Sequence, residues 1–166
     1  MKRISRNATA VALLLALSVT AASAKADFNG TWILDKNNTE GLPPGVDQVM
    51  TVVQTGDKIE LQTKVITEDG EQVVPDSYML NGEEVEFTPK TLAGQTGKGK
   101  RTARWTADGN GLEVKEASTF EGPEGAVEIR MQRYWKLSPD GKTLKIELVA
   151  EGPQGTQNVK RTFIRK

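Results

Sequence analysis

The stretch VEIRMQRYWKLSPDGKTLKIEL, residues 127–148, decides the fold of this chain. Its first eleven residues and its last five alternate between apolar and polar side chains. This period of two is typical of a β-strand with one face in the core and one face in water. Between the two runs, Ser138 to Gly141 supplies proline, aspartate and glycine, which favour a tight turn. The stretch therefore predicts a β-hairpin.

The same pattern repeats along most of the chain. Residues 59–65 alternate in the same way, and ten such runs are joined by links rich in Gly, Asp, Asn and Pro. Asn81–Gly82 is the strongest two-residue hairpin signal, because both residues tolerate a positive φ. Longer links run from Asp35 to Asp47 and from Pro89 to Gly99. We find no helical periodicity beyond the N-terminal apolar segment.

These strands and short links predict an all-β fold. A Greek-key sandwich needs long connections that cross between two sheets, whereas a meander needs only hairpins. We therefore expect an antiparallel up-and-down β-barrel of about 8–10 strands in meander order, with the sandwich as the alternative. Closure of the ring removes the unpaired strand edges that an open sheet would expose.

The N-terminus has the pattern of a cleavable export signal. Lys2, Arg3 and Arg6 precede an apolar segment from Ala8 to Ala21, and Ala22-Ser23-Ala24 gives a small-residue cleavage site. A second such site ends at Ala26, so cleavage is expected near Ala24 or Ala26. A permanent N-terminal membrane anchor is the alternative, although the apolar segment is shorter than the roughly 20 residues that span a bilayer. We expect residues 1–24 to be removed, leaving residues 25–166 as one periplasmic or secreted domain without stable membrane insertion.

Composition excludes several classes of function. The chain has no His and no Cys, so the usual nucleophile–base dyads, zinc sites and disulfides are ruled out. After removal of residues 1–24 it carries 19 basic and 22 acidic residues, which argues against nucleic acid as a partner. Residues 94–100 match the glycine–lysine spacing of a phosphate loop, but Arg101 replaces the Ser or Thr that would hold magnesium. We expect no cofactor, no metal and no enzymatic activity.

The two ends of residues 25–166 carry a resemblance. Gly30-Thr31-Trp32 near the start and Arg165 in the last strand resemble the calycin superfamily, which comprises lipocalins and fatty-acid-binding proteins. The chain as a whole resembles small exported lipocalin-like proteins of bacteria. The resemblance implies that Trp32 begins the first strand and that Arg165 packs over its ring, closing the base of the barrel by a cation–π contact.

The fatty-acid-binding branch implies a ligand site. Arg161-Thr162-Phe163 is similar to its Arg-x-Tyr motif, in which the arginine grips a carboxylate together with a second inward arginine. Arg133 alternates in phase with Trp135 and would be that second arginine. Phe163 lacks the hydroxyl of the motif. The alternative is an internal ion pair, because Glu116 lies on the inward phase of its own strand and would pair with Arg133 or Arg161.

Two aromatic residues complete the candidate ligand site. Tyr78 and Trp105 fall on inferred inward phases, where they either complete the core or stack on a ligand. Thr63, Glu116 and Ser118 also fall on inward phases, and such polar lining favours a partly hydrated cavity.

These observations predict a binding protein. The expected partner is a small hydrophobic or amphipathic molecule in the barrel interior, with a carboxylate near Arg133 and Arg161. One alternative is an envelope interaction or structural module with a filled barrel, whose protein partner the sequence does not name. A carboxylate-dependent isomerase or hydrolase is a further alternative, although no pair of carboxylates stands out.

Overall fold

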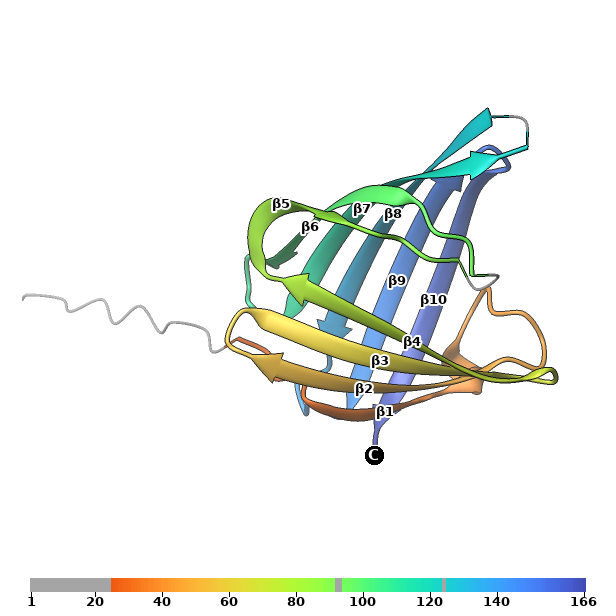
Figure 1. Cartoon of the computed structure of the whole chain (residues 1–166). Coiled ribbons are helices and arrows are strands. Elements are labelled where there is room, and N and C mark those ends of the chain that lie inside the picture. The colour runs from red at the N-terminus through yellow and green to blue at the C-terminus, as the bar shows by residue number, and fades with distance from the viewer. Residues whose placement is uncertain (1–24, 92–93, 124) are drawn as a thin grey trace, which may run out of the picture.

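The strands follow one another in a simple meander. Within residues 25–91, 94–123 and 125–166, the computed structural model contains ten β-strands and one short 3₁₀ helix (Figure 1). The elements are β1 (Gly30–Leu34), η1 (Lys36–Asn38), β2 (Asp47–Thr55), β3 (Lys58–Thr67), β4 (Gly70–Met79), β5 (Asn81–Phe87), β6 (Lys98–Trp105), β7 (Gly111–Gly122), β8 (Gly125–Leu137), β9 (Thr143–Gly152) and β10 (Gly155–Arg165).

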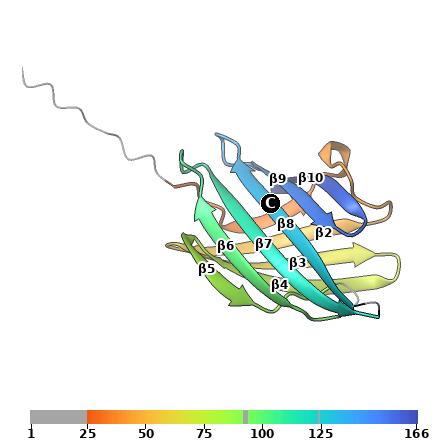
Figure 2. The ribbon, with the colours of Figure 1, turned by 90° about the horizontal axis from the view of Figure 1, so that it is seen from above.

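The sheet wraps round to form a barrel. Its strand order is β4-β3-β2-β1-β10-β9-β8-β7-β6-β5, and every neighbouring pair is antiparallel. The first and last strands pair directly, with Trp32 opposite Arg165. Seen from above, β2–β4 cross the strands β7–β10 at a steep angle, as two walls of one ring (Figure 2). This arrangement confirms the up-and-down barrel and contradicts the Greek-key sandwich.

The ring is nearly closed, and the expectation of complete closure is wrong at one place. Although both strands are fully described, no hydrogen-bonded ladder joins β4 to β5. The predicted Asn81–Gly82 hairpin does not form. Gly82 does adopt a positive φ of 78°, but Leu80 links the two strands and its N–H donates to the Asp57 carbonyl over 2.7 Å. Because Leu80 is buried, β5 turns away from β4 and pairs with β6 instead (Figure 1).

The free edge of β4 is protected by its own residues. Pro75 has no N–H to offer to another strand. Two residues later, the Ser77 N–H donates to Oδ1 of Asp76 over 2.9 Å, and the Ser77 carbonyl accepts from Arg101 over 2.8 Å. Since alternate residues of a strand point their backbone groups to the same edge, Pro75 and Ser77 leave few groups there for another chain.

An aromatic floor closes one end of the barrel. Phe28 and Trp32 are fully buried, and Tyr78 and Trp135 are nearly so. The Phe28 and Trp135 rings meet edge to face with 5.8 Å between centroids, and Tyr78 meets Trp135 in the same way at 6.2 Å. The guanidinium carbon of Arg165 lies 4.6 Å from the centre of the Trp32 ring. The floor therefore joins Phe28 and β1 to the last strand.

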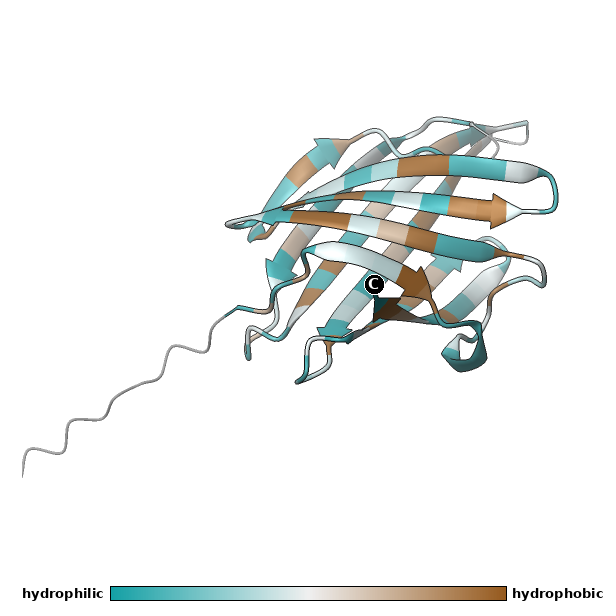
Figure 3. Cartoon of the chain, turned by 90° about the horizontal axis from the view of Figure 1, so that it is seen from below, coloured by the Kyte–Doolittle hydropathy of each residue, from teal (hydrophilic) through white to brown (hydrophobic). Residues whose placement is uncertain are grey.

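Apolar and polar residues alternate along the strands, as Figure 3 shows by colour. The predicted export signal, residues 1–24, lies outside the described residues. In the part of the chain that is described, no helix has the length and apolar character needed to cross a membrane.

Candidate functional site: the barrel interior

The interior is packed at the floor and accessible above it. On β8 the inward side chain of Trp135 is buried, while Arg133, Met131 and Ile129 on the same face are only half-buried. On β9 and β10, too, the inward side chains are buried near the floor and half-buried further from it. The half-buried apolar side chains of this upper wall are Val65, Val74, Ile129, Met131, Leu148 and Val159. Solvent therefore reaches these apolar side chains in the upper half of the barrel.

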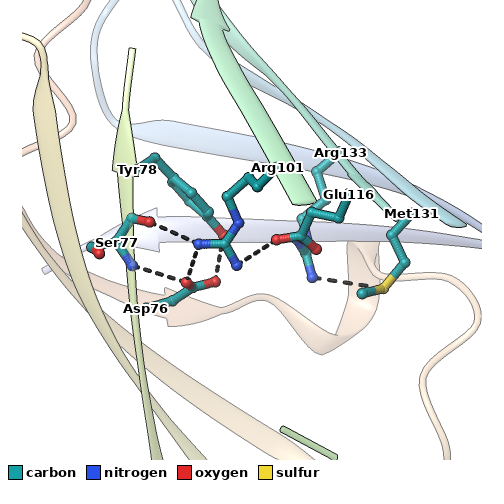
Figure 4. Close-up of polar contacts among 7 residues, drawn as sticks. All are labelled: Asp76, Ser77, Tyr78, Arg101, Glu116, Met131 and Arg133. Atoms are coloured by element: carbon teal, nitrogen blue, oxygen red, sulfur yellow. Dashed lines mark hydrogen bonds and ion pairs between the residues drawn. The ribbon is translucent and has the colours of Figure 1, made fainter. Parts of the chain in front are cut away.

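A cluster of charged side chains lies directly above the floor. Arg101 is at its centre: Nη1 lies 2.7 Å from Oδ1 of Asp76, and Nη2 lies 2.5 Å from Oε1 of Glu116. The other carboxylate oxygen of Glu116 lies 2.5 Å from Nη1 of Arg133. Figure 4 shows the row, with Arg101 between Asp76 and Glu116 and with Arg133 beyond. Four strands, β4, β6, β7 and β8, contribute one charged residue each.

Aromatic rings hold Arg101 in place. Its guanidinium carbon lies 4.8 Å from the centre of the Tyr78 ring and 4.0 Å from that of Phe87. The Tyr78 hydroxyl donates to Oδ2 of Asp76 over 2.9 Å. Burial raises the pKa of Tyr78, so the phenol stays protonated and able to donate. Tyr78 thus belongs to both the floor and the charged cluster.

Arg133 has an internal partner. Besides the ion pair with Glu116, its Nη2 lies 3.7 Å from the Met131 sulfur. Burial favours the neutral form, but the negative charges nearby, that of Glu116 among them, raise the pKa of Arg133 overall. Of the two sequence-based alternatives, the internal pair describes Arg133 in this structure.

Arg161 is different. It lies on the inward face of β10 next to the buried Phe163, and no described atom accepts a hydrogen bond or forms an ion pair with it. Its Nε is buried without a partner. Burial lowers the pKa of Arg161, and the positive charge of Arg133 lowers it further. A guanidinium in this position is short of an anion.

A count of the charged side chains in the interior also shows that one arginine lacks an anionic partner. Taken together, the charged cluster and Arg161 comprise three arginines, Arg101, Arg133 and Arg161, and two carboxylates, Asp76 and Glu116. One positive charge therefore remains uncompensated.

The remaining predicted residues lie at the base. Phe163 is buried and packs in the floor. Trp105 stacks on Phe28 with 6.0 Å between ring centroids, and its indole N–H donates to Oδ1 of Asp57 over 3.0 Å. Gly30 lies under the side chain of Arg165. The structure brings Tyr78, Arg133 and Arg161 to the interior, but it places Trp105 at the rim of the base.

Sequence reasoning missed the roles of Arg101 and Asp76. Both fall on inward phases, Arg101 with Ala103 and Asp76 with Tyr78, and that alternation was the available signal. Their pairing was not predictable because β4 and β6 are joined by no ladder, within the residues that the structure describes. In the same residues, no group of three or more His, Cys, Asp or Glu side chains is arranged to hold a metal ion.

Comparison with known proteins supports the fold. No protein-family model matches the chain, and no curated protein matches it. The crystal structure of zebrafish ileal bile acid-binding protein complexed with cholic acid is similar, with a TM-score of 0.51 and 21% identity. The match covers 84% of this chain and 98% of that one. At this identity the likeness shows the fold alone: the chain is a nearly closed up-and-down β-barrel, as the zebrafish protein is a barrel.

Proposed function

We propose that this protein binds a small hydrophobic or amphipathic molecule inside the barrel, with an anionic group next to Arg161. The observation that carries the proposal is the unpartnered guanidinium of Arg161, which lies inside the barrel below a half-open apolar wall. Holding a buried charge without a partner costs several kcal/mol, and the anionic group of a ligand would offset this cost.

The layers of the interior give the ligand an orientation. The apolar residues lie above the charged cluster, and the aromatic floor lies below it. An amphipathic molecule would place its anionic end near Arg161 and its apolar part along Met131, Leu148 and Val159. Guanidinium geometry suits a carboxylate or sulfonate because two parallel N–H groups pair with two oxygens.

The similar zebrafish protein supports the class of ligand. It is a bile acid-binding protein in complex with cholic acid, an amphipathic acid, in a barrel of the same fold. We extend this class of ligand to the present chain as part of the proposal. We further propose that the protein acts after export, because residues 1–24 have the pattern of a signal peptide, and that it acts as a carrier without catalysis.

Two fluorescent probes test the proposal. Anilinonaphthalene sulfonate is anionic, whereas phenylnaphthylamine has nearly the same rings and no charge. Arg161→Gln should weaken binding of the anionic probe about tenfold, the effect of losing one charge-assisted contact, and leave the neutral probe within about twofold. Arg133→Gln should have a smaller effect, since Glu116 already holds Arg133.

The matched control is Lys160→Gln. Lys160 is the preceding residue on β10, points outward and is exposed, so its loss changes the net charge equally without touching the interior. Equal weakening of both probes by Arg161→Gln would reject the anion site. Native mass spectrometry of protein purified from its host gives an independent test, because the complete absence of a bound or titratable amphipathic molecule would contradict ligand binding altogether.

A further inference from the structure

The ring of strands has one seam, between β4 on one side and β5 and β6 on the other. Elsewhere neighbouring strands are held by backbone hydrogen bonds, but β4 approaches β6 without a ladder in the described structure. Side chains alone bridge this approach. A boundary of this kind separates at lower cost than a ladder, because few hydrogen bonds have to break.

Arg101 bridges the seam. It extends from β6 and donates to Oδ1 of Asp76 and to the carbonyl of Ser77, both on β4, over 2.7 and 2.8 Å. Its second anchor, Glu116, is on β7 and therefore on its own side of the seam. The side chain of Arg101 is only 8% exposed, while that of Asp76 is 26% exposed. Arg101 is therefore anchored to β7 on its own side, and its contacts with Asp76 and Ser77 are the ones that cross the seam.

Two hollows flank this bridge. One, of about 700 Å³, lies between β4 and residues Phe87 and Thr88, and both Asp76 and Arg101 line it. The other, of about 150 Å³, is lined by Tyr78, Ala103 and Arg101 among others. Most residues of the larger hollow, such as Gln62 and Pro75, point outward from β2, β3 and β4, so it is a groove on the outer surface that borders Asp76 and Arg101 of the charged cluster.

We propose that the seam is a lateral gate through which the ligand enters the barrel, and that Arg101 and Asp76 form its latch. The inference rests on the proposed function, since it concerns the route to the same interior. The larger hollow ends at Arg101 and Asp76, so opening their contact would bring an anionic group to the cation that lies nearest the seam. The aromatic floor closes the base of the barrel to a ligand.

The rate at which a buried thiol is labelled measures how often the seam opens in the unliganded protein. The chain has no cysteine, so Ala103→Cys introduces a single thiol at a position that is 2% exposed and lines the smaller hollow. Asp76→Asn, which removes the charge and keeps the shape, should speed its labelling about tenfold. Glu71→Gln is the matched control: it lies on the same strand but pairs with Lys64 within the sheet. A thiol at Val52, buried on β2, should label at an unchanged rate in every variant.

Stopped-flow mixing with anilinonaphthalene sulfonate measures the rates of ligand binding and release, and so tests whether the ligand passes through the seam. Asp76→Asn should raise the dissociation rate about five- to tenfold, because it opens the gate. The association rate should rise by a larger factor, since the variant also removes a carboxylate beside Arg101 and so attracts the anionic probe. Phe87→Leu, which removes the ring stacked on Arg101, should act in the same direction and serves if Asp76→Asn folds poorly.

The outcomes separate the two proposals. If the wild type fails to bind the probe, the proposed function falls and the gate falls with it as a ligand route. If the probe binds but its rates are the same in Asp76→Asn and Glu71→Gln, the seam is not the route. Unchanged labelling at position 103 would show that Arg101 and Asp76 are no latch.

Discussion

Glu116 holds Arg133 inside the barrel, with 2.5 Å between Oε2 of the carboxylate and Nη1 of the guanidinium. The carboxylate is 1% exposed, and its other oxygen pairs with Arg101. This relationship changes the two-arginine grip that the sequence suggested. Arg133 already has an anion, and Arg161 remains as the cation without one. Glu116 therefore sets how much positive charge the interior offers to a ligand.

Replacing Glu116 with Gln should weaken the fold and strengthen anion binding. The variant leaves Arg101 and Arg133 with one carboxylate fewer, and breaking a buried ion pair costs about 3 kcal/mol of unfolding free energy. The freed Arg133 adds a second cation to the site, so anilinonaphthalene sulfonate should bind several-fold more tightly. Urea unfolding and a probe titration measure the two effects.

Glu113→Gln is the control for this variant. Glu113 is on the same strand, but it faces outward and pairs with Lys115 at 3.2 Å. Its loss should leave probe affinity unchanged. Weaker probe binding by Glu116→Gln, in protein that remains folded, would mean that Glu116 organises the site rather than competes with the ligand.

Replacing Arg161 with Gln should make the unliganded protein more stable. The guanidinium has a buried Nε without a partner, and burial together with Arg133 lowers its pKa, so its charged form is disfavoured in the fold. Removing the charge should raise the free energy of unfolding by about 1 kcal/mol, as binding sites often gain stability when their strained charges are removed. Chemical unfolding without ligand measures this, with Lys160→Gln as the reference. A loss of stability would show that Arg161 has a structural role.

The alternation of residues predicted a large part of this site. Val127 to Leu137 has one unbroken period of two, which placed Arg133 on the same face as Trp135, and β8 has that arrangement. The choice of partner for Glu116 was beyond the sequence because it depends on register. Glu116 lies opposite Met131, and Val114 lies opposite Arg133, so the ion pair is diagonal. No residue pattern encodes that offset.

The seam was harder to predict for a physical reason. Asn81–Gly82 has the chemistry of a hairpin turn, and a paired β4–β5 was the natural expectation. The buried Leu80 and its hydrogen bond to Asp57 instead turn the chain away. A tertiary contact thus overrides a local turn preference, and only coordinates show that Arg101 meets Asp76 across the gap.

Arg165 should stabilise the base of the barrel by about 1 kcal/mol. Its guanidinium covers the Trp32 ring, and Nη2 donates to the Asp27 carbonyl over 2.5 Å. Arg165→Gln removes the cation and should lower the free energy of unfolding by about that amount. Lys166→Gln is the control, because Lys166 is exposed. Equal stability of the two variants would contradict a role for the cation–π contact.

Protonation of Asp57 should account for part of the loss of stability in acid. A hydrogen bond from Lys25 and a second from Trp105 hold the pKa of Asp57 below its ordinary value. A carboxyl whose pKa is lower in the folded state stabilises the fold above its unfolded pKa, about 3.9, and loses that contribution as the pH falls through the folded value. The difference in stability between wild type and Asp57→Asn should therefore be constant from pH 7 to about pH 5 and shrink below about pH 4. Urea unfolding at several pH values measures it, and a difference that grows in acid would contradict the assignment.

The first residues after the predicted export signal should matter for stability. The Ala26 N–H donates to the Gly109 carbonyl over 2.9 Å, its carbonyl accepts from Gln54 over 3.2 Å, and Lys25 pairs with Asp57 at 2.5 Å. Of the two candidate cleavage sites, the one after Ala24 keeps these contacts and the one after Ala26 removes them. The free energy of unfolding should therefore be about 1–2 kcal/mol higher for a chain that begins at Lys25 than for one that begins at Asp27, because the shorter chain loses both hydrogen bonds of Ala26. Chemical unfolding of the two chains measures the difference, and intact mass of the exported protein shows which one is made. Equal stability of the two chains would mean that the contacts of Lys25 and Ala26 do not stabilise the base of the barrel.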